Sequence, residues 1–71
     1  MTKKEVLNLE LIKKLRCKKG ITIERMSKIL GYEVYQAYYY KEKGSRKMSA
    51  EDIAKIAYIL KVPIEKLFLI K

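Results

Sequence analysis

Residues 22–44 read TIERMSKILGYEVYQAYYYKEKG and contain two helical patterns joined by a short turn. Thr22 suits the N-cap of the first pattern, whose apolar residues recur at helical spacing until Gly31. The second pattern covers residues 34–43 and is followed by another glycine. Two short helices joined by a tight turn that contains glycine are typical of a helix-turn-helix. The stretch therefore predicts such a motif over about residues 22–43.

The second helix of this pair has two different faces. One face has the spacing i, i+3, i+4, i+7 and consists of Gln36, Tyr39, Tyr40 and Lys43. The opposite face, with Ala37 and Tyr38, is more apolar. An amide, two phenols and an ammonium suit a polar partner, because tyrosine can donate to a phosphate or press its ring on a thymine methyl. The pattern predicts a helix that packs its back on a core and presents its front to nucleic acid.

The residues before this pair predict one helix. It begins at Thr2, whose hydroxyl can cap the helix while Glu5 bonds back to the cap. Leucine and isoleucine recur at helical spacing as far as Leu15, and Gly20 ends the segment. The first helix is therefore expected to extend from Thr2 almost to Gly20.

The residues after the pair predict two more helices. Ser49 caps the first of them, with Asp52 three residues on in a short version of the capping box. Pro63 is acceptable at the start of the second, which is barely more than one turn over residues 64–68. Convincing strand alternation is found nowhere. The sequence predicts an all-α, compact five-helix single domain over residues 1–71.

Composition excludes several classes of function. A chain of 71 residues has a small core, which argues against a large enclosed substrate pocket. With no histidine and one cysteine, it lacks material for common metal sites and catalytic triads, so we expect no enzyme activity, metal, cofactor or small-molecule ligand. No apolar run approaches the ~18 residues of a membrane-spanning helix. We expect a cytoplasmic protein without membrane association, because a single cysteine needs no oxidising compartment.

The charge is strongly positive and unevenly distributed. The net charge is +9, which suits a polyanion such as nucleic acid. Residues 1–20 carry seven cations and two anions, and residues 34–48 carry four cations and one anion. The lysines of the first helix favour a solvated face, because a helical lysine needs no partner. Arg46 and Lys47 directly follow the predicted recognition helix, where they can bind phosphate.

In this order and spacing, the motifs resemble those of the lambda-repressor-like (Cro/Xre) helix-turn-helix family. The resemblance extends from about Leu11 to Phe68. The motifs that carry it are Leu15-Arg16, Gly20-Ile21-Thr22, Ser27, Leu30-Gly31, the run Glu42-Lys43-Gly44-Ser45-Arg46-Lys47, Ile56-Ala57, Leu60 and Leu67-Phe68. The resemblance implies a DNA-binding protein whose second motif helix enters the major groove. It also implies an origin in a bacterium or its mobile elements.

The chain departs from the family pattern at three places. Ile23 stands where many relatives carry a phosphate-binding Gln, and Glu33 would repel a phosphate that it faced. The interval from Gly31 to Glu42 is also one residue longer than the commonest spacing in the family.

The position of the extra residue has two alternatives. If it lies in the turn, Tyr38 is the buried anchor, and the outward residues are Gln36, Tyr39 and Lys43. If it lies later, Ala37 and Tyr40 face inward instead. We favour the turn, because that placement leaves both Gln36 and Lys43 exposed.

Together these features predict a sequence-specific transcriptional regulator of double-stranded DNA, a repressor that binds a palindromic operator as a homodimer. Gln36 is the best candidate adenine reader, because its amide can be bidentate to adenine N6 and N7. Tyr39 and Lys43 are expected to contact bases or flanking phosphates, and Tyr35 and Tyr40 are further candidates.

Other residues are expected to contact the DNA backbone or a second copy of the chain. The predicted backbone contacts are Thr22, Ser45, Arg46 and Lys47. Leu69 and Ile70 extend the apolar run beyond the needs of a small monomer, which suggests a symmetric dimer seam.

Two other functions stay open. The same fold can serve as a protein-interaction module, such as an antitoxin or anti-repressor that acts through a partner protein. The basic first helix could also lie on an anionic membrane, but its charges are spread around the helix instead of gathering on one side, which counts against that function.

Overall fold

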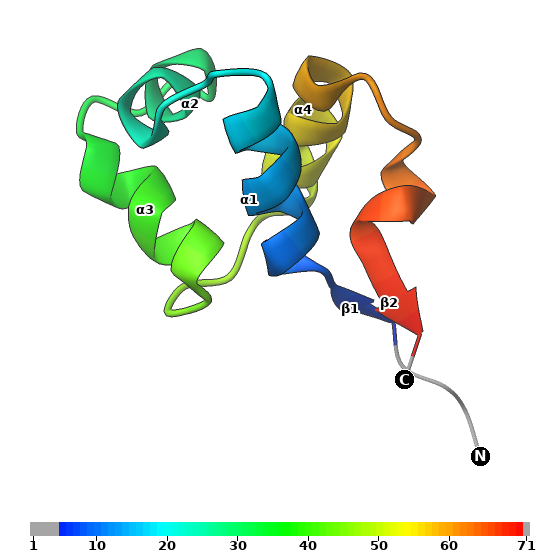
Figure 1. Ribbon diagram of the computed structural model, residues 1–71. Coiled ribbons are helices and arrows are strands. Elements are labelled where there is room, and N and C mark those ends of the chain that lie inside the picture. Colours follow the sequence, from blue (N-terminus) through cyan, green and yellow to red (C-terminus); the bar gives the residue numbers. More distant parts are fainter. Residues whose placement is uncertain (1–4, 71) are drawn as a thin grey trace.

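The structure is a computed structural model that describes residues 5–70 (Figure 1). This part of the chain folds into four α-helices, a 3₁₀ turn and a two-stranded sheet. The elements in chain order are β1 (Glu5–Leu7), α1 (Leu9–Lys18), α2 (Ile23–Ile29), α3 (Tyr35–Lys43), α4 (Ala50–Leu60), η1 (Ile64–Leu67) and β2 (Phe68–Ile70). α2 packs on α3, and α1 contacts both α3 and η1. α1 therefore connects the helix pair to the C-terminal part of the domain.

The start of the first helix is a correction to the sequence prediction. The segment Glu5–Leu7 is a strand and not helix, and α1 begins only at Leu9. Asn8 caps α1, because its side chain accepts a hydrogen bond of 3.2 Å from the Leu11 amide. The predicted cap, Thr2, lies outside the described residues.

The absence of strands is likewise a wrong prediction. β1 and β2 pair antiparallel, with Val6 opposite Leu69 and Leu7 opposite Phe68. Leu7 and Phe68 are partly buried and pack against the core, whereas Val6 and Leu69 are exposed. The sheet joins opposite ends of the chain, so no local alternation in either segment reveals it.

The predicted fifth helix is a single 3₁₀ turn. Ile64–Leu67 form this turn, and Phe68 already belongs to β2. The Lys66 amide donates to the Pro63 carbonyl over 3.0 Å. Complete burial of Leu67 anchors the turn, and the chain then extends to pair with β1. The domain thus has four α-helices among its described residues and not five.

The predicted helices α2, α3 and α4 are confirmed, as are the predicted N-caps of α2 and α4. The Thr22 hydroxyl accepts from the Arg25 amide over 3.1 Å, and Ser49 and Asp52 form the expected reciprocal capping box of α4. α3 ends at Gly44, whose φ of 95° is a left-handed conformation that glycine adopts without strain.

The α2–α3 turn is held by two hydrogen bonds from α2. The Tyr32 amide donates to the Ser27 carbonyl over 3.0 Å, and the Ser27 hydroxyl donates to the Val34 carbonyl over 2.7 Å. Ser27 is buried, so a larger side chain at this position would separate the two helices. The turn between α2 and α3 is therefore a fixed connection.

The core takes side chains from all four helices and the 3₁₀ turn. Its buried hydrophobic residues include Ile12, Met26, Leu30, Tyr38, Ile56, Ala57, Leu60 and Leu67. Tyr38 is completely buried, whereas Tyr40 is 40% exposed. The prediction that Tyr38 is the buried anchor is confirmed, and the alternative that turns Tyr40 inward is wrong.

We expect the Tyr38→Phe variant to be as stable as the natural chain or more stable by up to about 2 kcal/mol. The hydroxyl of this buried residue has no hydrogen-bond partner among the described residues, so its removal relieves a desolvation cost. Urea unfolding measures the difference. A loss above ~1 kcal/mol would contradict the expectation and show that the hydroxyl forms a stabilising bond.

Candidate nucleic-acid interface

Helix α3 is held from behind by two ion pairs. They involve adjacent residues of α3 and two different helices: Lys41 pairs with Asp52 of α4, and Glu42 pairs with Arg16 of α1. Tyr38, one turn earlier, is buried on the same side of α3. These contacts determine which side of the helix turns towards solvent.

The pair between Arg16 and Glu42 is bidentate and buried. Arg16 Nε and Nη2 donate to the two carboxylate oxygens of Glu42 over 2.9 and 3.0 Å, and Nη1 donates to the Ile21 carbonyl over 2.6 Å. The hydrogen bonds to Glu42 raise the pKa of Arg16 and outweigh the opposing effect of burial. The planar guanidinium thus connects three parts of the domain in one fixed geometry: α1, α3 and the loop that precedes α2.

This ion pair was not predicted, although Arg16 and Glu42 both belong to the motifs that carry the family resemblance. A signal was present in the helix periodicity. Arg16 is four residues after the buried Ile12, and Glu42 is four residues after the buried Tyr38, so both charges fall on core-facing stripes. Two opposite charges on apolar faces indicate a buried pair, because isolated charges are too costly to bury.

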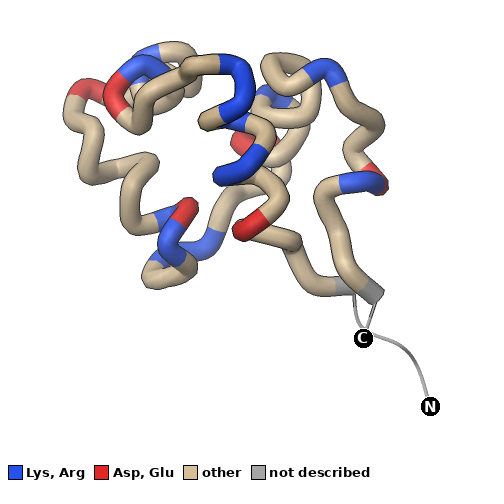
Figure 2. Tube along the Cα trace, in the orientation of Figure 1, with Lys and Arg blue, Asp and Glu red and all other residues tan. Residues whose placement is uncertain are grey.

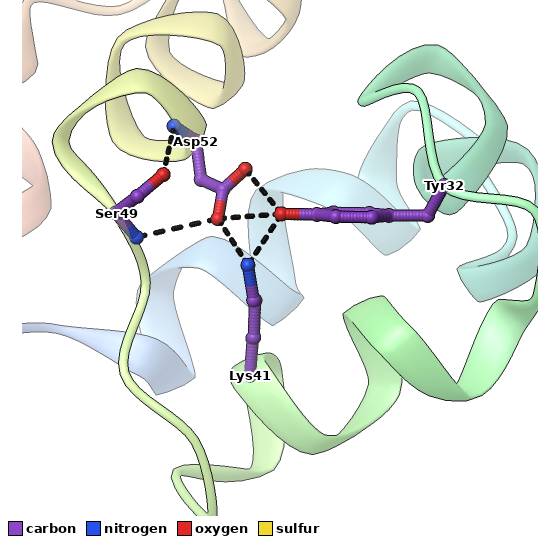
Figure 3. A network of polar contacts seen from close by, with 4 residues as sticks. All are labelled: Tyr32, Lys41, Ser49 and Asp52. Carbon is purple, nitrogen blue, oxygen red and sulfur yellow. Dashed lines mark hydrogen bonds and ion pairs between the residues drawn. The ribbon is translucent and has the colours of Figure 1, made fainter.

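The second ion pair belongs to a network around Asp52 (Figure 3). Lys41 Nζ lies 2.6 Å from Asp52 Oδ2, and the Tyr32 hydroxyl donates to both carboxylate oxygens over 2.8 and 2.9 Å. The Lys41 ammonium also donates to the Tyr32 oxygen and lies 4.5 Å from the centre of the Tyr32 ring. The Ser49 amide donates to Asp52 as part of the capping box. The network joins the α2–α3 turn, the back of α3 and the start of α4.

The environment of Asp52 favours its ionised form. Burial by itself would raise the pKa of this carboxyl, but the hydrogen bonds from Lys41, Tyr32 and the Ser49 amide outweigh burial and lower the pKa. At the other end of the pair, burial would lower the pKa of Lys41, but the hydrogen bonds to Asp52 and Tyr32 outweigh burial and raise this pKa.

The front of α3 carries the predicted base-reading residues. Gln36 and Lys43 are exposed, and Tyr35, Tyr39 and Tyr40 are each between 39% and 48% exposed. The rings of Tyr39 and Tyr40 meet edge to face with centroids 5.3 Å apart, and Lys43 Nζ lies 5.7 Å from the Tyr39 centroid. The structure brings these five side chains together on one surface.

The predicted backbone-contacting residues border this surface at both ends. Thr22 and Tyr35 line the same shallow depression beside the start of α2. Beyond the other end of α3, Ser45, Arg46 and Lys47 are exposed, and the amides of Ser45 and Arg46 donate to the Tyr40 carbonyl. The front of α3 is therefore continuous with a phosphate-binding candidate at each end.

Lys13 of α1 adjoins the same surface, although the sequence favoured a solvated face for the lysines of this helix. A groove of about 410 Å³ between α1 and α3 is lined by Lys13, Tyr39 and Lys43, with the Arg16–Glu42 pair among its other walls. Figure 2 shows Lys and Arg along α1 and around the end of α3. The side chain of Lys13 thus adds positive charge beside the recognition helix, a position that depends on how α1 packs on α3.

Negative charge is located near the turn of the motif. Glu24 of α2 and Glu33 of the turn are exposed and line a depression with Tyr35 and Gln36. Lys28 lines the same depression, so charges of both signs lie near the turn, and the groove between α1 and α3 likewise combines Lys13 and Lys43 with Glu10.

Two searches of residues 5–70 gave negative results. No helix in this part of the chain is both long and apolar enough to cross a membrane. The same residues contain no group of three or more His, Cys, Asp or Glu side chains placed to hold a metal ion.

The family to which the sequence matches agrees with the helix pair seen in the structure. A family model described as helix-turn-helix covers residues 12–67, from α1 to the end of η1. The chain belongs to the lambda-repressor-like (Cro/Xre) helix-turn-helix family. Members of this helix-turn-helix family are DNA-binding regulators and not typically enzymes, so membership indicates a DNA-binding regulator. A search of curated proteins found no match.

In this helix-turn-helix domain, we expect Arg16→Met to lower the free energy of unfolding by about 3–5 kcal/mol, because Glu42 would remain buried without its partner. Adding Glu42→Leu should recover most of the loss. Urea unfolding compares the single and double variants, with the exposed Lys14→Met on the same helix as the control. A double variant as unstable as the single one would contradict the assigned pairing.

The network around Asp52 predicts a dependence of stability on pH. The pKa of Asp52 is lowered on folding, so ionisation of this carboxyl stabilises the folded state. This contribution to the free energy of unfolding is complete above the ordinary carboxyl pKa of about 4. The contribution is lost as the pH falls through the lower value of the folded state. We expect the Asp52→Asn variant to be less stable than the natural chain at neutral pH. On acidification, the variant should lose less free energy of unfolding than the natural chain does.

Urea unfolding at a series of pH values between about 6 and 2 measures this difference. Glu51→Gln, which changes the exposed neighbour of Asp52, is the matched control. Identical pH profiles for Asp52→Asn and the natural chain would contradict the role given to this carboxylate.

Proposed function

We propose that this domain binds double-stranded DNA sequence-specifically, with the front of α3 in the major groove. The observation that carries the proposal is the division of α3 into a fixed back and a polar aromatic front. A B-DNA major groove about 12 Å wide admits an α-helix, and base edges there present donors, acceptors and the thymine methyl. Gln36, Tyr39 and Lys43 offer complementary groups from successive turns of one exposed face.

The roles of individual residues follow from their positions on α3. Gln36 is in the first turn and is proposed to read adenine through its amide. Tyr39 and Lys43 follow on the same face and are proposed to contact bases or adjacent phosphates. Tyr35 and Tyr40 stand on either side of this line and are proposed as further base contacts.

The backbone contacts are proposed to hold the two ends of α3 over the groove. The Thr22 hydroxyl uses its oxygen to accept from the Arg25 amide, so its proton is available for a phosphate. Ser45, Arg46 and Lys47 are proposed to bind phosphate beyond the opposite end, with Lys13 as an additional contact. Glu24 and Glu33 disfavour close phosphates near the turn and so restrict the register of docking.

We further propose that two copies bind a palindromic operator and repress transcription by occupying it. Val6 and Leu69 support a dimer seam on the sheet, because they are directly opposite in the register and each is 41% exposed. Pairing through this face would give a two-fold dimer with half-sites about 34 Å apart. A repressor acts where its DNA lies, so the expected cytoplasmic location is part of the same proposal.

Selection of duplexes from a random pool tests the function as a whole. We expect enrichment of one motif that is repeated as an inverted pair. Failure to bind any duplex at low salt, together with co-purification of an acidic protein, would contradict the proposal and favour the protein-interaction module.

Two substitutions should separate base reading from phosphate binding. Gln36→Ala is expected to weaken binding to the selected duplex by about 1–3 kcal/mol and to relax base preference. Arg46→Ala should weaken binding to selected and scrambled duplexes about equally, because a phosphate contact carries no sequence information. Equal losses on both duplexes for Gln36→Ala would refute its assignment.

If about five phosphates are neutralised per protomer, log affinity should fall with log salt at a slope of about −4 to −5.

The dimer proposal predicts that Leu69→Lys yields a monomer. A charge on this apolar face should repel the second copy, while Leu67 still anchors the strand to the core. Sedimentation equilibrium measures the mass, and Lys66→Met on the neighbouring turn is the control. An unchanged dimer would place the seam elsewhere, and a natural chain that is monomeric even on DNA would refute the dimer.

A further inference from the structure

The front of α3 has an unusual chemical balance for a base-reading surface. Its exposed residues are Tyr35, Gln36, Tyr39, Tyr40 and Lys43. There is no arginine in α3, although a bidentate arginine is the commonest specific reader of guanine. Three of these five side chains are tyrosines. The base-edge groups that suit such a surface are therefore the apolar ones.

The rings of Tyr39 and Tyr40 are held in place before any ligand arrives. They meet edge to face at 5.3 Å, and the Lys43 ammonium lies 5.7 Å from the centre of the Tyr39 ring. About two fifths of each side chain remains exposed. The two residues thus present an ordered apolar surface. A ligand that binds to it causes little further loss of side-chain conformational entropy.

In the major groove, the base edges offer one apolar group, the 5-methyl of thymine. We propose that Tyr39 and Tyr40 recognise thymine by packing their rings on this methyl group, beside an adenine bound by Gln36. This inference rests on the proposed docking of α3 in the major groove. Gln36 and Tyr40 are one helical turn apart, which is about 6 Å or two base-pair steps. Each of these contacts accordingly falls on an A·T pair of the half-site.

Substitution of uracil for thymine tests the proposal without any protein variant. Uracil pairs with adenine as thymine does and lacks only the methyl group. The probe is the duplex recovered by selection, with each thymine replaced by uracil in turn. We expect the Kd to rise about fourfold for each methyl that the rings bury, at one or two positions in each half-site.

Protein variants then assign the effect to the two rings. Tyr39→Ala and Tyr40→Ala should each bind the thymine and uracil forms equally at the affected position, whereas the Phe variants should keep the discrimination. Tyr58→Ala is the matched control, because Tyr58 lies on α4 and is 86% exposed. It should discriminate as the natural chain does. Circular dichroism confirms that each variant is folded.

The outcomes separate this inference from the proposed function. Equal affinity for thymine and uracil at every position of a selected duplex would overturn methyl recognition while leaving DNA binding intact. A discrimination that persists in both alanine variants would overturn the assignment to Tyr39 and Tyr40. Failure to recover any duplex would refute the proposed function itself.

Discussion

The orientation of α3 depends on two ion pairs made by adjacent residues, one buried and one partly buried. Glu42 is bound bidentately by Arg16 of α1, and Lys41 is bound by Asp52 of α4. Buried pairs are not strong sources of stability, because desolvation offsets much of the attraction. Their geometry is specific, however, and a rotation of α3 that released either pair would leave a buried charge uncompensated. With Tyr38 in the core beside them, the helix has one permitted orientation and one permitted exposed face.

This constraint connects the fold to the proposed function. A helix that reads base edges must present its side chains in a fixed arrangement, because positional errors on the scale of a hydrogen bond remove specificity. The network around Asp52 also attaches the α2–α3 turn and the start of α4 to the back of α3. The loop with Arg46 and Lys47 lies between α3 and α4, so the phosphate-binding candidates are positioned by the same contacts.

Local signals in the sequence predicted much of the motif, and non-local contacts account for what was missed. Caps, glycines and helical periodicity predicted α2, α3 and α4. The requirement that Gln36 and Lys43 both be exposed correctly predicted Tyr38 as the buried anchor. β1 and β2 come from opposite ends of the chain, and Arg16 and Glu42 are 26 positions apart. Periodicity places Arg16 and Glu42 on core-facing stripes, but which segments meet across such a distance depends on tertiary packing. The surface position of Lys13 beside α3 was missed for the same reason. The DNA-contacting roles of the site residues stay predictions.

The central claim is that the front of α3 is the surface that contacts DNA. Titration of the isotope-labelled protein with the selected duplex, followed by backbone amide NMR, tests this claim directly. The account predicts the largest shift changes at Thr22 and in residues 35–47, with small changes around Tyr58 on the outer side of α4. Dominant changes on α4 or on the sheet, with α3 unaffected, would contradict it.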